Sequence, residues 1–273
     1  MSDAPERSIS ENTQALCDAY RGYASIGRDI VPGPHCRIIR NHDAPDVYDA
    51  NFLEVGPESA VESALAFLDV ELAERTHRSV RTDPFSPPEF DAELTLRDFI
   101  PDPTIQLLLD GELLGPRPKD CDIHRVQSEA DWTTLSRLFR ADHLETDRKR
   151  GTSIFSPSLT KQIVANNRLA QKHLHFFMAW DKDEAVAFFS SWFSSWPGTQ
   201  GGGMVEDLFT LPSHRNRGIA RALIHQCVGD ARARGADRVL IGAEVDETPK
   251  DLYAAMGFRA TCITTSWTKT VSR

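Results

Sequence analysis

The segment LPSHRNRGIA, residues 211–220, combines residue types that can bind an anion. Arg215 and Arg217 lie directly before Gly218, which stands between a predicted strand and a predicted helix. A glycine there permits a tight turn, and the first N–H groups of a helix are unpaired and partly positive. Together these groups can surround a phosphate or pyrophosphate. The segment alone also fits a solvated basic turn, so its surroundings must decide between the two interpretations.

Two motifs in this region follow each other at a characteristic spacing. The pattern Leu-Pro-x-x-Arg-x-x-Gly-x-Ala occupies residues 211–220, and DETPKDLYAAMGF occupies residues 246–258. Together they closely resemble the acyl-CoA signature of the GNAT superfamily of N-acyltransferases. In the second motif Asp246 replaces the usual Asn and Pro249 replaces the usual Ala, whereas four positions fit: Leu252, Tyr253, Gly257 and Phe258.

The resemblance implies a cosubstrate and the residues that hold it. Acetyl-CoA would be bound with its pyrophosphate on the backbone N–H groups of the glycine loop. Backbone groups of the preceding strand would bind the pantetheine arm and polarise the thioester carbonyl. The predicted coenzyme-binding residues are Leu208, Phe209, Thr210, Leu211, Arg215, Asn216, Arg217, Gly218, Ile219, Ala220 and Asp246.

The resemblance also implies direct attack of an amine on the thioester, which needs a base and an acid. Tyr253 occupies the family's general-acid position; the alternative is a core tyrosine with a satisfied hydroxyl. Glu206 is the first candidate for the base, acting through water, and Asp207 is the second; the alternative is an ordinary surface carboxylate. Strand alternation places these two carboxylates on opposite faces unless a bulge intervenes.

The bulk composition narrows the function classes. The 273-residue chain has a net charge of −9, which argues against broad nucleic-acid binding. Its five cysteines form no CxxC pair, and no apolar run of about 18 residues could span a membrane, so we expect a cytoplasmic protein without disulfides. His173 and His175 share a strand face without a third ligand, so no metal site is predicted.

Periodicity predicts a mixed α/β fold. Residues 122–273 give the order βααβββαβαβ, which agrees with the GNAT fold, and the helix after Gly218 shows a single apolar face. Ser128 and Asp131 form a variant of the capping box at an earlier helix start. Trp192 and Trp196 share a strand face, as core residues or as part of an acceptor pocket.

The first half resembles the second only weakly. A gapless overlay aligns a helix–strand–helix–strand layout but places Pro57, Ala60 and Leu94 where Arg215, Gly218 and Tyr253 stand. We therefore expect a tandem arrangement, in which the first unit is GNAT-like but lacks the coenzyme loop and the acid. The predicted division is an irregular segment, with at most a short helix, at 1–33, a degenerate GNAT-like domain at 34–118 and a catalytic GNAT domain at 119–273.

The function expected from these observations is N-acetylation of a primary amine of a small molecule, without nucleic-acid or membrane partners. Glu206 and Asp207 favour a cationic acceptor. A non-catalytic acyl-CoA-binding module and a protein lysine or N-terminal acetyltransferase remain as alternatives. The sequence predicts neither the acceptor's identity nor the oligomeric state.

Overall fold

The computed structural model describes residues 9–118, 121–194 and 201–271. The first half contains α1 (Ile9–Ala24), β1 (Asp29–Pro32), β2 (Cys36–Arg40), η1 (Tyr48–Ala50), β3 (Phe52–Val55), α2 (Val61–Glu71), β4 (His77–Thr82), α3 (Glu89–Leu96) and β5 (Ile100–Asp110). The second half contains β6 (Asp122–Arg125), α4 (Glu129–Arg150), α5 (Pro157–Leu169), η2 (Ala170–Lys172), β7 (Leu174–Asp181), β8 (Glu184–Ser194), β9 (Gly202–Thr210), η3 (Pro212–His214), α6 (Ile219–Ala233), β10 (Arg238–Glu244), α7 (Pro249–Ala255) and β11 (Arg259–Thr270).

The element order predicted for the second half is confirmed, including its helix start signals. Ser128 accepts a hydrogen bond from the backbone N–H of Asp131, whose side chain bonds back to Ser128, so the capping box forms. One prediction for the first half needs correction. Within the segment 1–33, expected to be irregular with at most a short helix, residues 9–24 form α1 and residues 29–32 form β1.

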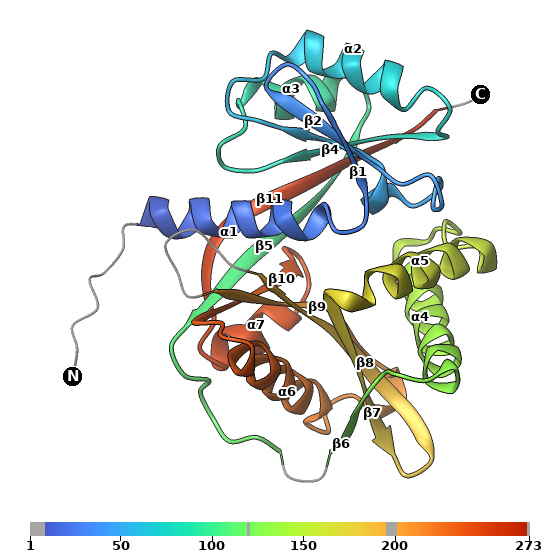
Figure 1. Ribbon diagram of the computed structural model, residues 1–273, viewed down its shortest axis with the longest axis vertical. Coiled ribbons are helices and arrows are strands. Elements are labelled where there is room, and N and C mark those ends of the chain that lie inside the picture. Colours follow the sequence, from blue (N-terminus) through green and yellow to red (C-terminus); the bar gives the residue numbers. More distant parts are fainter. Residues whose placement is uncertain (1–8, 119–120, 195–200, 272–273) are drawn as a thin grey trace.

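The strands form one sheet in which the two halves exchange their last strands. The order is β1-β2-β3-β4-β11-β5-β10-β9-β8-β7-β6. β11 lies antiparallel to β4 of the first half, and β5 lies antiparallel to β10 of the second half. In Figure 1 these two strands run side by side through the middle of the molecule. A division between residues 118 and 119 would therefore separate each strand from a partner in the other half.

Helices cover both faces of this sheet. On the second half, α6 and α7 enclose one core, and α4 together with α1 encloses another on the opposite face. The predicted apolar face of α6 lies in the first of these cores, with Leu223, Ile224 and Cys227 fully buried. On the first half, α2 and α3 cover a separate core that includes Trp267 of β11.

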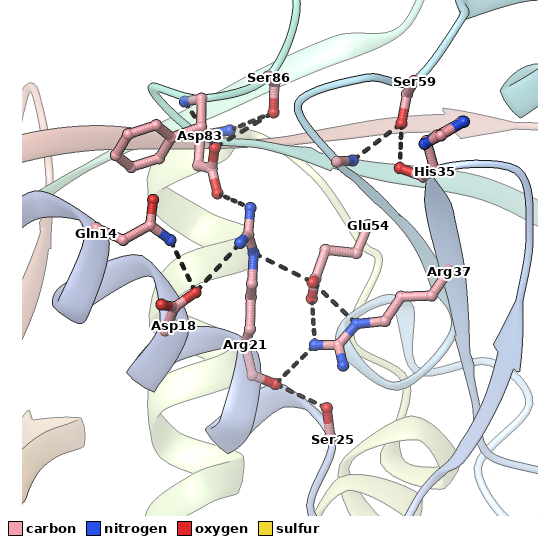
Figure 2. A network of polar contacts seen from close by, with 12 residues as sticks. Gln14, Asp18, Arg21, Ser25, His35, Arg37, Glu54, Ser59, Asp83 and Ser86 are labelled. Atoms are coloured by element: carbon pink, nitrogen blue, oxygen red, sulfur yellow. Dashed lines mark hydrogen bonds and ion pairs between the residues drawn. The ribbon is translucent and has the colours of Figure 1, made fainter. Parts of the chain in front are cut away.

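Helix α1 crosses between the two halves and contacts both (Figure 1). Its Leu16 is fully buried in the core that also contains Trp192 of β8. On the first half, the Arg21 guanidinium lies 2.7 Å from Asp83 and 3.3 Å from Glu54, and Arg37 binds the same Glu54 at 2.9 Å (Figure 2). These side chains are mostly buried, so the ion pairs hold α1 against the sheet of the first half.

Within the described residues, no helix combines the length and the apolar character that crossing a membrane requires.

Candidate active site

A large cavity opens where two parallel strands separate. β9 and β10 pair only from Gly202 to Val205 and from Arg238 to Ile241, and beyond these residues they diverge. The cavity between them has a volume of about 850 Å³. Its walls come from β9 and β10, the loop before α6, α7 and one face of α4. Volume and position fit a ligand site at the ends of the strands.

A bulge in β9 places two carboxylates beside this cavity. Between the pairs Phe188–Phe209 and Ser190–Glu206, two residues of β9 stand opposite one residue of β8. Asp207 occupies the bulge with a φ of 57°. Ser190 faces the same side as its partner Glu206, and its hydroxyl donates a 2.9 Å hydrogen bond to Asp207. Both carboxylates therefore lie on the α1 side of the sheet, as the sequence allowed only if a bulge were present.

The pKa values of the two carboxylates are raised because both groups are removed from water and Asp207 lies near Glu206. Burial and the charge of Asp207 raise the pKa of Glu206 to about 8. Burial raises the pKa of Asp207 to about 6, against the lowering effect of the Ser190 hydroxyl. Asp142 on α4 joins them, because burial and the charges of Asp207 and Glu145 raise its pKa to about 7. Groups with pKa values near neutrality suit proton transfer.

Tyr253 lines the cavity from α7. Its side chain is buried, and no described residue forms a hydrogen bond with its hydroxyl. The alternative, a core tyrosine whose hydroxyl is hydrogen-bonded within the protein, therefore has no support among the described residues. Burial and the charge of Glu206 raise its pKa, which keeps the hydroxyl protonated at neutral pH. The side chain can therefore donate a proton into the cavity.

The loop before α6 presents backbone N–H groups to the other end of the cavity. Asn216 and Gly218 adopt left-handed conformations, with φ of 60° and 80°. Among the described residues, the N–H groups of residues 216–218 form no backbone hydrogen bond, and Gly218 caps α6 without a side-chain acceptor. Alternating left-handed residues at a helix N-terminus form an anion-binding concavity.

Carboxylates already neutralise the two arginines of this loop. Arg215 forms a bidentate pair with Glu145 of α4 at 2.8 and 2.7 Å, and it also donates to the Thr210 carbonyl at 3.0 Å. Arg217 lies 2.9 Å from Asp181 of β7. The loop's capacity for an anion therefore comes from its backbone, and Arg215 instead fixes α4 against β9.

Comparisons with known proteins agree with this geometry. The sequence profile of the Acetyltransferase (GNAT) family matches residues 132–258. Residues 132–258 belong to the GNAT acetyltransferase family. A comparison with curated protein sequences finds no match.

Solved structures show that the tandem fold extends over almost the whole chain. A tandem GNAT protein from the clavulanic acid biosynthesis pathway is 12% identical, with a TM-score of 0.57 over 97% of this chain and 95% of its own. A GCN5-related N-acetyltransferase from Kribbella flavida is 16% identical, with a TM-score of 0.59 over 96% and 93%. A functionally unknown protein from Staphylococcus epidermidis is 12% identical, with a TM-score of 0.69 over 90% and 96%.

Most predicted site residues of the GNAT domain line the cavity, and a few do not. Leu208, Phe209, Thr210, Tyr253 and most of the glycine loop line it, whereas Glu206, Leu211, Arg217 and Asp246 do not. The N–H of Leu211 donates to the Val186 carbonyl at 2.9 Å, so the strand ladder already uses this donor. Glu206 acts through its charge on Tyr253, which does line the cavity.

Sequence reasoning missed the wall that α4 supplies. Asp142, Glu145, Thr146 and Lys149 line the cavity at helical spacing, so they form one polar stripe on α4. The same periodicity that revealed apolar faces could have revealed this stripe.

Trp192 and Trp196 were predicted to share a strand face, either in the core or in an acceptor pocket. Trp192 is a buried core residue that contacts Tyr23, with ring centroids 5.8 Å apart. Trp196 lies outside the described residues.

Of the two histidines considered for a metal, His175 takes part in another contact. His175 on β7 lies 3.1 Å from Asp230 of α6, a pair that ties the helix to the sheet. Over the described ranges, no cluster of three or more His, Cys, Asp or Glu side chains has an arrangement that could hold a metal ion.

Proposed function

We propose that this protein is an acetyl-CoA-dependent N-acetyltransferase that acts on a primary amine of a small molecule. One observation carries the proposal: a single cavity joins the loop at residues 216–218 to Tyr253, whose hydroxyl has no hydrogen-bond partner among the described residues, with Glu206 and Asp207 adjacent. This arrangement matches the parts that a direct acyl transfer needs.

The glycine loop fits the pyrophosphate of a coenzyme. The N–H groups of residues 216–218, which form no backbone hydrogen bond within the described ranges, and the first turn of α6 would hold it, and Gly218 leaves the backbone open to close approach. When bound, acetyl-CoA supplies the activated acetyl thioester. Leu208, Phe209 and Thr210 would lie along the pantetheine arm, since they line the cavity between the loop and Tyr253.

The carboxylates would accept a proton from the amine, and the tyrosine would donate a proton to the leaving sulfur. An alkylammonium has a pKa near 10.4, so the acceptor must lose a proton before its nitrogen attacks. Glu206, with a pKa of about 8, takes this proton, directly or through a water molecule. As the carbon–nitrogen bond forms and the carbon–sulfur bond breaks, Tyr253 would give its proton to the leaving sulfur. The nitrogen would release its second proton as the amide forms, and this proton would restore the Tyr253 hydroxyl through water. Neighbouring Asp207 favours the protonated form of Glu206 and so strengthens it as a base.

The proposal is tested by comparing acetyl transfer from acetyl-CoA to an amine with hydrolysis of acetyl-CoA. Purified protein is incubated with acetyl-CoA and a panel of primary amines, and both the released thiol and the acetylated amine are quantified. Amine-dependent thiol release with stoichiometric acetylated product is expected. Tight acetyl-CoA binding without transfer to any amine would instead indicate a non-catalytic acyl-CoA-binding module, and transfer only to protein lysines or N-termini would place the acceptor in another class.

A further inference from the structure

The cavity between β9 and β10 is lined from both faces of the sheet. Tyr253 on α7 and the loop before α6 line it from the face that α6 and α7 cover. The polar stripe of α4 lines it from the opposite face, through Asp142, Glu145, Thr146 and Lys149. If the loop holds the coenzyme and Tyr253 faces the sulfur, the α4 side is the part of the cavity that remains for the acceptor.

A chain of aromatic contacts positions Asp142 over β9. Asp142 lies about one helical turn after Phe139 on α4. Phe139 packs on Phe188 with ring centroids 4.5 Å apart, and Phe188 packs on Phe209 at 5.8 Å. Phe209 belongs to the core under α4 and α1, and it lines the same cavity as Asp142. Asp142 therefore faces the side of the sheet on which Asp207 lies.

The other carboxylates that line the cavity already have cationic partners. Their ion pairs are Glu145 with Arg215 at 2.7 Å, Glu244 with Arg150 at 2.7 Å and Glu247 with Lys149 at 3.5 Å. Over the described ranges, Asp142 forms neither an ion pair nor a hydrogen bond. The cavity thus contains one carboxylate that no described side chain neutralises by direct contact.

The surroundings of Asp142 make its negative charge unfavourable. Burial is the main cause, and the charges of Asp207 and Glu145 add to it. The charges of Lys149 and Arg215 act in the opposite direction, but both cations bind Glu145, at 3.4 and 2.7 Å, and the pKa of Asp142 is still raised to about 7. A cation that enters the cavity would therefore find a carboxylate available for a direct contact.

We propose that Asp142 binds the ammonium group of the acceptor in this cavity. The inference rests on the proposed N-acetyltransferase function. Tyr253 lines the same cavity, is 4% exposed and has no hydrogen-bond partner among the described residues, so a ligand there would satisfy a carboxylate from one face and a hydroxyl from the other. Glu206 does not line the cavity, so Asp142 supplies the direct contact and Glu206 receives the ammonium proton through water.

Kinetics with charged and neutral amines test this role. Benzylamine and putrescine are alkylamines and are cationic at neutral pH, since an alkylammonium has a pKa near 10.4, whereas aniline is neutral. Asp142→Asn preserves the size of the side chain and removes its charge. We expect it to raise KM for the alkylamines about ten- to hundredfold, the size of one charged hydrogen bond, and to leave KM for aniline and for acetyl-CoA nearly unchanged. Asp142→Glu should retain part of the preference for alkylamines.

Glu129→Gln is the matched control on the same helix. Glu129 is not among the residues that line the cavity and it binds Arg168 at 2.9 Å, so this variant should keep the KM values of the wild type.

Thermal unfolding separates a binding role from a structural one. At pH 8, Asp142→Asn should have a Tm no lower than that of the wild type, because it removes a buried charge without a partner in the described ranges. A carboxylate that only stabilised the fold would lower Tm when replaced. If Asp142→Asn does not fold, Asp142→Ala takes its place in the same assays.

Four results would overturn the assignment while leaving N-acetylation intact. Folded Asp142→Asn could keep the wild-type KM for benzylamine and putrescine, it could lose activity toward aniline to the same extent, or it could raise KM for acetyl-CoA instead. Transfer by the wild type to aniline but to neither alkylamine would be the fourth. By contrast, absence of transfer to every amine, with acetyl-CoA still bound, would refute the proposed function itself.

Discussion

Replacing Gly218 with valine should weaken acetyl-CoA binding without removing the catalytic groups. Gly218 has a φ of 80°, a conformation that costs a residue with a Cβ about 1–2 kcal/mol. A Cβ at this position would also lie 3.3 Å from Cγ of Pro118. The valine would therefore shift the loop, and the N–H groups of residues 216–218 would lose their common orientation.

The size of the effect follows from the hydrogen bonds lost. A hydrogen bond to a charged phosphate contributes about 1.5–3 kcal/mol, so losing one raises KM for acetyl-CoA about ten- to hundredfold. Because Tyr253 and Glu206 stay in place, kcat at saturating acetyl-CoA should change much less. The free energy of unfolding should fall by about 1–2 kcal/mol, the conformational strain alone.

Gly229→Ala is the matched control in the same helix. A Cβ at Gly229 meets no atom within 4 Å, and alanine in a helix interior stabilises by about 0.5–1 kcal/mol relative to glycine. Steady-state kinetics with varied acetyl-CoA and urea unfolding are measured for both variants. A folded Gly218→Val protein with an unchanged KM for acetyl-CoA would remove the loop from the coenzyme site.

Three further predictions concern proton transfer. Tyr253→Phe should lower kcat about 10²- to 10⁴-fold with little change in acetyl-CoA affinity, as measured by steady-state kinetics and calorimetry; an equal rise in the dissociation constant would contradict the acid role. Ser190→Ala removes the hydrogen bond that lowers the pKa of Asp207, so that pKa should rise above about 6 in a carboxyl NMR titration. For Glu206, the folded state binds the proton more tightly than the unfolded state, so stability falls as pH rises from 4.5 to about 8. Glu206→Gln should therefore flatten the decline of Tm over this window, and an unchanged slope would mean that Glu206 is not buried as described.

The helices and strands of the second half could be predicted from local sequence patterns, because each of them depends mainly on residues that are close together in the sequence. The apolar positions of α6 recur with the helical period, and Leu223, Cys227 and Ala231 indeed fill one core. Ser128 and Asp131 meet within a single turn, so a capping box can be seen in the sequence alone. The glycine loop likewise carries its own signal, because Gly218 needs a positive φ.

Features that depend on distant partners were not predictable in this way. The Arg215 charge seemed available to an anion until the structure placed Glu145 against it. The bulge at Asp207 contains no glycine that would have indicated it in the sequence. Its positive φ nevertheless determines that both carboxylates lie on the same face of the sheet. Helix α1 is polar enough in sequence to be predicted as irregular, and its position depends on distant partners such as Trp192 and the Asp83 that pairs with Arg21.

The strand exchange gives the first half a structural reason to be inseparable from the GNAT domain. β5 supplies Leu107 and Leu109 to the core under α6, and each is 2% exposed. Burying a leucine contributes about 1.5–3 kcal/mol, so these two side chains alone contribute about 3–6 kcal/mol, a large part of the net stability of a typical domain. β11 in return inserts Trp267 into the core of the first half. Because each half of the single sheet contains a strand from the other half, neither half is complete on its own.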